Sequence, residues 1–272
     1  MVRITLREGS VEPDEGVDFH VAVSDEAGTP HAYTQQDGGR SHVRIPGLVT
    51  FGFDAGSSVV VADVASGADH EEVLDAYRTL CIPLAVQGAF GQEVVHASGV
   101  RIAHRGVVGF CGMSTTGKST IAHALARRGH QLWADDALAF QPDGESIGTL
   151  ALPFRPNLRP ESERFFRTLG ARELDQAAAW SEATVNTLFV LDASSGIEQL
   201  ERLSAVDALV AVLPNGYRFR PLDDQREQRM VRTYLDLVAR VPVFRSGYER
   251  GLDGLERLVD RIEETIDSAH RV

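Results

Sequence analysis

GMSTTGKS, residues 112–119, is the stretch that decides the fold of this chain. It matches the pattern G-x-x-x-x-G-K-[ST] at each fixed position, namely Gly112, Gly117, Lys118 and Ser119. Glycines let such a loop turn its backbone N–H groups toward a phosphate, the lysine bridges the β- and γ-phosphates, and the hydroxyl binds Mg²⁺. The pattern therefore predicts a phosphate-binding loop for ATP and Mg²⁺. A glycine-rich turn with a solvated lysine is the alternative.

The residues on both sides of the loop support this prediction. GVVGFCG before it is typical of a strand, and STIAHALARRG after it is typical of a helix. HQLWADD then indicates a further strand, so the segment predicts a βαβ unit. Lys118 is the only lysine among 27 basic residues, and a compact ammonium suits a tight phosphate loop better than a guanidinium. The predicted nucleotide-binding residues are Gly112, Ser114, Thr115, Thr116, Gly117, Lys118, Ser119 and Thr120.

A phosphate loop that transfers phosphate also needs carboxylates, for Mg²⁺ and for the acceptor proton. Asp135 and Asp136 follow the strand QLWA directly, and Asp192 ends the strand TLFVLD. Two adjacent carboxylates at a strand end can divide these roles between them. The pair is therefore the first choice and Asp192 the second, with a solvated strand-end aspartate as the alternative for each.

Composition narrows the class of protein. The chain of 272 residues is 43% hydrophobic and 24% charged, which is typical of a globular protein with a substantial core. A net charge of −12 argues against a broad nucleic-acid surface. Cys81 and Cys111 are the only cysteines, too few for a disulfide framework or a thiolate metal cluster. With no signal peptide and no apolar run of membrane length, we expect a cytoplasmic protein with no membrane partner.

The chain is expected to divide near residue 90. Residues 1–90 predict a smaller β-rich module that ends in a linking helix. This helix begins near Asp69, and Pro83 interrupts it or bounds it. Residues 91–272 predict an α/β domain that contains the phosphate loop.

The spacing of apolar residues and the positions of prolines predict further elements of the second domain. LPFRPNLRP (152–160) is expected to be a loop, and VPVFR a short strand. Residues 171–181, rich in Ala and Glu, and residues 223–240 are expected to be helices. A last amphipathic helix carries the apolar residues Leu255, Leu258, Val259 and Ile262 at helical spacing.

Longer strings around the loop resemble the catalytic domain of bacterial HPr kinase/phosphorylase, and more closely its shorter relatives. The strings are VVHASGV (94–100), GMSTTGKST (112–120), ALARRGHQLWADD (124–136), LPFRPNLRP (152–160) and, near the end, VPVFRSGYERGLDGL. The resemblance covers about residues 70–265. It implies the P-loop kinase fold of the type shared by HPr kinase and phosphoenolpyruvate carboxykinase.

The resemblance also implies a reaction and roles for individual residues. Asp136 falls on the family's general base, which takes the proton of an acceptor serine, and His96 falls near the histidine that couples to it. Lys118 falls on the phosphate clamp, while Ser119 and Asp135 are the implied magnesium ligands. The implied reaction transfers the γ-phosphoryl group of ATP to a serine-type hydroxyl of a protein or a biosynthetic precursor peptide.

Three features depart from the full-length enzyme. Thr120 stands where that enzyme usually has glutamate, and neither its glycine-rich signature loop nor its regulatory N-terminal domain is recognisable. The acceptor, a phosphorylase reaction and homo-oligomer formation therefore stay open. A small-metabolite kinase and a catalytically silent nucleotide-binding module are the alternative functions. Candidates for binding an anionic acceptor or the γ-phosphate are Arg155, Arg159 and Arg218, with ordinary surface arginines as the alternative.

Overall fold

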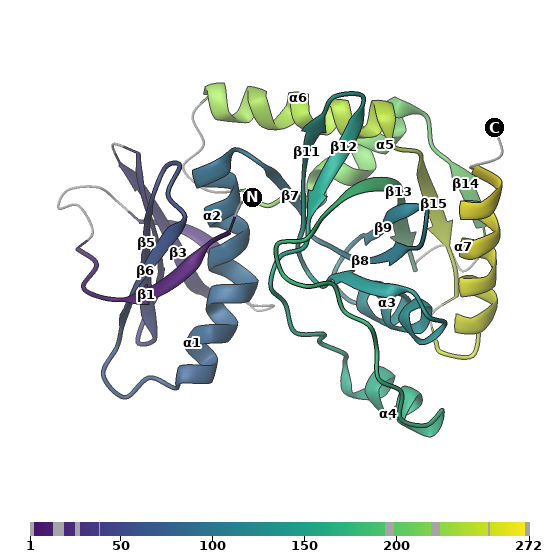
Figure 1. The fold of residues 1–272 in the computed structure, drawn as a ribbon, viewed down its shortest axis with the longest axis horizontal. Helices are drawn as coiled ribbons and strands as arrows, with labels where there is room; N and C mark the ends of the chain where they lie inside the picture. The colour runs from purple at the N-terminus through teal and green to yellow at the C-terminus, as the bar shows by residue number, and fades with distance from the viewer. Residues whose placement is uncertain are drawn as a thin grey trace. The chain divides into compact units, whose positions relative to one another are not determined.

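The computed structural model describes residues 3–12, 19–24, 28–37, 39–193, 199–218, 224–249 and 251–269. Its contacts divide the chain into two units, both drawn in Figure 1. The first unit combines Met1–Val94 with Tyr217–Met230, and the second combines Val95–Gly216 with Val231–Val272. The mixed α/β class expected from the sequence is confirmed, with two separate sheets.

The first unit contains a six-stranded sheet in the order β1-β6-β5-β4-β3-β2. Its strands are β1 (Thr5–Glu8), β2 (His20–Ser24), β3 (Pro30–Asp37), β4 (Arg40–Ile45), β5 (Val49–Asp54) and β6 (Val59–Val64). Neighbouring strands are antiparallel, except that β1 runs parallel to β6. Alternation along β5 buries Val49, Phe51 and Phe53, and Phe51 contacts Tyr77 with ring centroids 6.0 Å apart.

The helical segment of this unit continues past Pro83, so of the two expectations for this proline the boundary does not hold. It comprises α1 (His70–Ala76), a π-helical turn (Tyr77–Cys81) and α2 (Ile82–Phe90). The Asp69 carboxylate caps α1 by accepting the N–H groups of Glu71 and Glu72. Pro83 lacks an N–H for the helix ladder, and the π-helical turn just before it accommodates the missing bond. Pro83 therefore alters the helix locally without ending it.

The second unit is built on a larger mixed sheet, in which β10, β8, β9, β13, β12 and β11 are consecutive neighbours. These strands are β8 (Ala97–Ile102), β9 (Gly106–Cys111), β10 (Gln131–Ala134), β11 (Leu138–Asp143), β12 (Ser146–Leu150) and β13 (Glu182–Asp192). β15 (Val243–Gly247) pairs with β13 and with β14 (Gln199–Arg202). β7 (Glu93–Val95) lies where the two units meet along the chain.

Five helices of the described ranges accompany this second sheet. They are α3 (Lys118–Arg127), α4 (Pro160–Thr168), α5 (Ala205–Val212), α6 (Asp224–Arg240) and α7 (Leu255–Ala269), of which α6 begins in the first unit. Residue 223, where α6 was expected to begin, lies outside the described residues. α3 and α7 pack side by side (Figure 1), and Ile121, Leu125, Val259 and Ile262 are buried in one core with Phe110. None of the helices in the described ranges is both long and apolar enough to cross a membrane.

One element predicted for the second unit is wrong, and several elements of this unit were not predicted. Residues 171–181 contain no helix. Two of their backbone groups bond to Leu132 of β10 instead: the Leu132 N–H donates to the Asp175 carbonyl at 2.8 Å, and the Leu132 carbonyl accepts the Ala177 N–H at 2.7 Å. Helix α4 instead follows the proline-rich segment directly, with Pro160 at its start and Glu161 in its first turn. The β11–β12 hairpin and α5 were also not predicted.

Candidate active site

The candidate site forms at one edge of the second sheet. β8 is antiparallel to both β9 and β10, so these two strands run parallel with β8 between them. The carboxyl ends of β9 and β10 therefore meet the amino end of β8, where Ala97 pairs with Cys111. This topology brings together His96, the loop that follows Cys111 and the Asp135–Asp136 pair, although they are well separated in the sequence.

Residues 112–117 form the loop between β9 and α3. Gly112 has a φ of 146°, and a Cβ at this position would lie 2.8 Å from the Leu191 carbonyl oxygen, so the loop requires glycine here. Gly117 has a φ of 80° and is the N-cap of α3. The Thr116 N–H and hydroxyl donate to the Met113 carbonyl at 3.3 and 2.8 Å. The loop thus closes in front of a helix N-terminus, which favours an anion.

Lys118 is the first residue of α3, and its side chain turns back into the loop. Its Nζ donates to the carbonyls of Gly112 and Met113 at 3.0 and 3.2 Å, and the residue is only 6% exposed. Burial lowers the pKa of Lys118 and the Arg159 charge adds to this, whereas nearby carboxylates, Asp136 above all, oppose it. The ammonium is therefore enclosed by the phosphate loop, with carboxylates near enough to interact with it.

Asp135 lies at the centre of a hydrogen-bond network. Its Oδ1 accepts the Ser98 hydroxyl at 2.7 Å, and its Oδ2 accepts the Asn157 N–H at 2.8 Å. The Ser119 hydroxyl oxygen lies 3.3 Å from the Ser98 oxygen, beside the same carboxylate. Burial raises the pKa of Asp135, while Asn157, Ser119 and Ser98 act in the opposite direction. The network fixes the position of the carboxylate relative to the first turn of α3.

Ser119 and Asp135 fit a magnesium ion in the type of donor that they offer. Hydroxyl and carboxylate oxygens are the ligands that Mg²⁺ prefers. In the part of the chain that the structure describes, no group of three or more His, Cys, Asp or Glu side chains could hold a metal by itself. A magnesium ion here would therefore also need phosphate oxygens and water, as is usual for Mg²⁺ sites with phosphate substrates.

Asp136 and His96 both line the same cavity as the loop. Asp136 has a φ of 82°, in the left-handed region that residues other than glycine rarely adopt, and such strain concentrates at functional positions. The backbone N–H of His96 donates to the Asn215 carbonyl at 2.7 Å. Burial lowers the pKa of His96 and Lys118 adds to this, while Asp136 opposes it by its charge and by a backbone hydrogen bond. His96 is therefore neutral near pH 7.

The cavity in front of the loop has a volume of about 860 Å³. Most of the residues predicted for the site line it: His96, Ser114, Thr115, Thr116, Gly117, Lys118, Ser119, Thr120 and Asp136. Gly112 and Asp135 do not line it, but Gly112 bonds to Lys118, and Asp135 is linked to Ser119 through the Ser98 hydroxyl. The structure therefore brings all the predicted site residues together at one place.

The other candidate residues differ in whether they line the cavity. Arg159 lines the cavity, whereas Arg155 does not and Arg218 belongs to the first unit. At the end of β13 the cavity is lined by Ala193 and not by Asp192. The second choice for the carboxylate role is therefore less well placed than Asp136.

Sequence reasoning missed three residues that shape the site: Ser98, Asn157 and Tyr248. Ser98 is a polar residue in an apolar strand beside the loop strand, a signal that could have identified it. Asn157 acts through its backbone N–H, which no residue pattern reveals. The Tyr248 hydroxyl donates to the Thr116 carbonyl, and this contact depends on the pairing of β13 with β15.

Comparisons with known proteins give a similarity in structure and none in sequence family. No family model matches the chain, and no curated protein matches it. Among solved structures, an HPr(Ser) kinase/phosphatase from Coxiella burnetii is similar, with a TM-score of 0.34 and 14% sequence identity. The alignment covers 65% of this chain and 95% of that one. The assignment of the site therefore rests on the geometry of its own residues.

Proposed function

We propose that this chain is an ATP- and Mg²⁺-dependent kinase that phosphorylates a serine-type hydroxyl of a protein or peptide, on a P-loop kinase fold of the HPr kinase type. One observation carries the proposal: a phosphate loop with Lys118 and Ser119 lines one cavity together with the Asp136 carboxylate, and the Asp135 carboxylate lies beside Ser119, bonded to Ser98. An enzyme of this kind needs little covalent chemistry, because positioning and charge neutralisation supply most of the rate.

The phosphate-loop side of the cavity suits ATP, the phosphoryl donor. Backbone N–H groups at the start of α3 and the Lys118 ammonium bind phosphate oxygens, and Lys118 exchanges its bonds to loop carbonyls for bonds to phosphate. Ser119 and Asp135 would hold Mg²⁺, which when bound would neutralise charge on the phosphates. Ser98 keeps the Asp135 carboxylate turned toward Ser119.

Asp136, which lines the same cavity, suits the acceptor. Asp136 accepts the proton of the acceptor hydroxyl while that oxygen bonds to the γ-phosphorus, and the bond from this phosphorus to the β–γ bridging oxygen breaks. ADP leaves, the phosphoryl group ends on the acceptor, and the proton ends on Asp136. His96 lines the same cavity, and because burial lowers its pKa it adds no positive charge beside Asp136.

Replacement of Asp136 tests the assignment. Asp136→Asn keeps the shape of the side chain but cannot take a proton, so we expect phosphate transfer to fall about 10²–10⁴-fold. Affinity for Mg·ATP should stay within about threefold, because the donor contacts remain. The measurement is transfer from γ-labelled ATP to a library of serine peptides and to hydroxylated metabolites, with calorimetry for binding.

Two further variants complete the test. Asp143→Asn, at an exposed strand end on the β11–β12 hairpin, should transfer phosphate like the wild type. Lys118→Met should lose nucleotide binding altogether. Undiminished transfer by Asp136→Asn would show that the base is another group, and ATP binding without any phosphorylated acceptor would contradict the kinase proposal itself.

A further inference from the structure

The cavity extends beyond the phosphate loop toward α7. On this side it is lined by the segment before α7 and by the first turns of α7 itself: Tyr248, Glu249, Gly251, Leu252, Asp253, Gly254, Leu255, Arg257, Leu258 and Arg261. None of these residues takes part in the phosphate or proton chemistry described above. We call this part of the cavity the α7 compartment.

The phosphate loop and α7 lie on the wall of the same cavity. Thr120 and Ile121, in the first turn of α3, line it together with the first turns of α7, and α7 packs against α3. Phosphates bound at the N-terminus of α3 would therefore leave the α7 compartment within reach of the rest of the nucleotide.

The chemistry of the compartment suits a nucleoside. Leu252, Leu255 and Leu258 supply apolar surface, and the three belong to or pack against the core that α3 and α7 share. Arg257 and Arg261 lie one turn apart on α7 and also line the space. A flat aromatic base can lie on an aliphatic surface with a guanidinium against its face, because a guanidinium is planar and weakly hydrated.

We propose that the α7 compartment binds the base and ribose of the nucleoside triphosphate donor, an inference that rests on the proposed kinase function. Leu252 and Arg257 are its specificity-determining residues: Leu252 contacts one face of the base, and the Arg257 guanidinium contacts the other. The carboxylates of Glu249 and Asp253 are the groups that accept the ribose hydroxyls.

Tyr248 connects the compartment to the phosphate loop. Its hydroxyl donates to the Thr116 carbonyl, and its side chain packs against the core that contains α7. Gly251 to Gly254 lead directly into α7. A direct hydrogen bond thus joins Tyr248 of the compartment to Thr116 of the loop. Because both residues line one cavity, one nucleotide can contact both.

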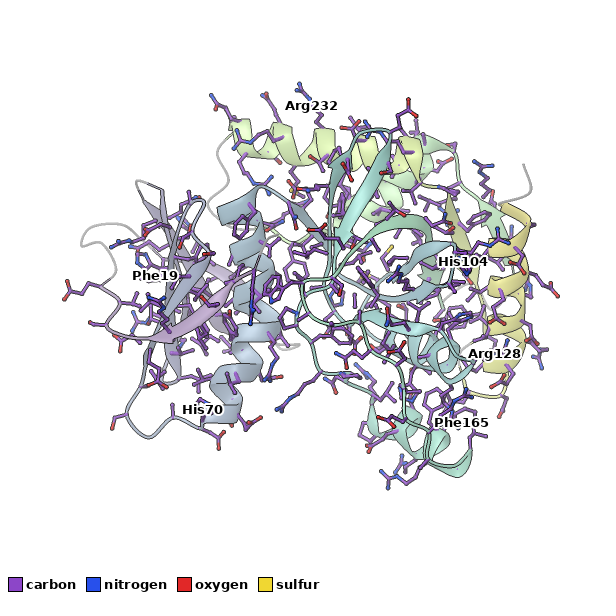
Figure 2. All side chains as sticks on the ribbon, viewed as in Figure 1. Phe19, His70, His104, Arg128, Phe165 and Arg232 are labelled. Carbon is purple, nitrogen blue, oxygen red and sulfur yellow. The ribbon has the colours of Figure 1, made fainter. Side chains whose placement is uncertain are left out.

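Inorganic tripolyphosphate separates the two parts of the site, because it carries the phosphates of ATP without its nucleoside. Calorimetry would measure binding of ATP and of tripolyphosphate, each with Mg²⁺, to the wild type and to four variants. Arg257→Ala removes the guanidinium, and Leu252→Trp fills the compartment. Arg232→Ala is the matched control, an exposed arginine on α6 that does not line the cavity (Figure 2). Lys118→Met removes the phosphate clamp.

We expect Arg257→Ala to weaken ATP binding about tenfold, corresponding to one cation–π or stacking contact. Leu252→Trp should weaken it more, and both variants should bind tripolyphosphate like the wild type. Arg232→Ala should bind both ligands unchanged. Thermal unfolding of each variant shows whether it is folded, and unchanged tripolyphosphate binding is an independent check of the same point.

Two results would overturn the inference. Unchanged ATP affinity in Arg257→Ala and Leu252→Trp would mean that the nucleoside lies elsewhere and that the compartment serves the acceptor. An equal loss of ATP and tripolyphosphate would mean that these residues act on the phosphate loop. Failure of the kinase proposal looks different, because Lys118→Met would then bind both ligands as well as the wild type does.

Discussion

His123 lies on α3 with its ring against Phe166 of α4, the two ring centroids being 4.4 Å apart. Its Nδ1 is buried and, among the described residues, has no hydrogen-bond partner. Arg127, one turn further along α3, donates to the carbonyls of Leu169 and Gly170 just after α4. Burial lowers the pKa of His123, and the charge of Arg127 adds to this. His123 is therefore a neutral residue in the contact between the two helices.

The buried position of His123 makes the free energy of unfolding depend on pH. Because the folded-state pKa lies below the unfolded value of about 6.5, the unfolded chain takes up the proton first as the pH falls. The contribution of His123 is thus fully present above that value and is lost below it. His123→Phe, which cannot titrate, should lose less stability than the wild type between about pH 7 and pH 5. Urea unfolding at both pH values measures this, and equal losses would show that His123 is not the group responsible.

For single residues, the sequence predicted those that would act through their own side chains. Lys118, Ser119 and Asp136 stand in patterns with a mechanism, and the structure brings them to one cavity. Ser98 and Asn157 contact Asp135 only because β8 and the segment after β12 come to the same edge of the sheet. Their roles depend on tertiary pairing, which a pattern of neighbouring residues does not contain.

Arg128 joins two elements, the end of α3 and the first three turns of α7. Its guanidinium pairs with Glu256, Asp260 and Glu263 at 2.6, 2.7 and 2.6 Å, and Figure 2 shows it beside α7. Glu263 also contacts His130 at 2.9 Å. A network of this kind, with a forked donor and a side chain that is 26% exposed, stabilises more than an isolated surface pair.

We expect Arg128→Ala to lower the free energy of unfolding of the second unit by about 1–2 kcal/mol, because three carboxylates on α7 lose their shared cation. Arg164→Ala, at an exposed position of α4, should change it by less than about 0.5 kcal/mol. The effect of Arg128→Ala should shrink in about 1 M NaCl, where screening is strong. Denaturant titration of the three proteins at low and high salt measures these differences, and a loss that salt does not reduce would point to packing and not to charge.

At the scale of elements, capping signals were more informative than composition. Pro160 at a first helical position, acidic residues after it and Arg167 near the end are the signals of a helix, and α4 forms there. Residues 171–181 have good helix formers, but intrinsic propensity is weak compared with the backbone bonds that Leu132 offers. The long strands and amphipathic helices, β13 and α7 among them, were predictable because their periodicity matches their burial.

The whole molecule has two cores that the linear sequence does not separate. Tyr217–Met230 belongs to the first unit, although it lies between segments of the second. Within the first unit Arg226 contacts both carboxylate oxygens of Glu93, which is 1% exposed, and the Gln87 amide donates to the Tyr217 carbonyl. A change of pattern predicts a division near residue 90, but a segment that returns to the first unit gives no such signal.

Each core contains one buried cysteine: Cys81 is in the first unit and Cys111 in the second. Burial raises the pKa of the Cys111 thiol to about 12, against the opposing effect of Lys118, and burial also raises the pKa of Cys81. Because the thiolate is the reactive form, alkylation of either residue requires its unit to open. The rate of labelling therefore reports the opening of each unit separately.

Nucleotide should slow the two reactions unequally. At about 100 times its Kd, Mg·ATP stabilises the unit that binds it by about 2.7 kcal/mol and so slows labelling of Cys111 about 100-fold. Labelling of Cys81 should change less than about threefold if the first unit opens by itself. Iodoacetamide kinetics on Cys81→Ser and Cys111→Ser, each with one thiol left, assign the rates. Equal slowing at both sites would mean that the two units open as one cooperative structure, since Cys111 is already buried and gains no direct cover from the nucleotide.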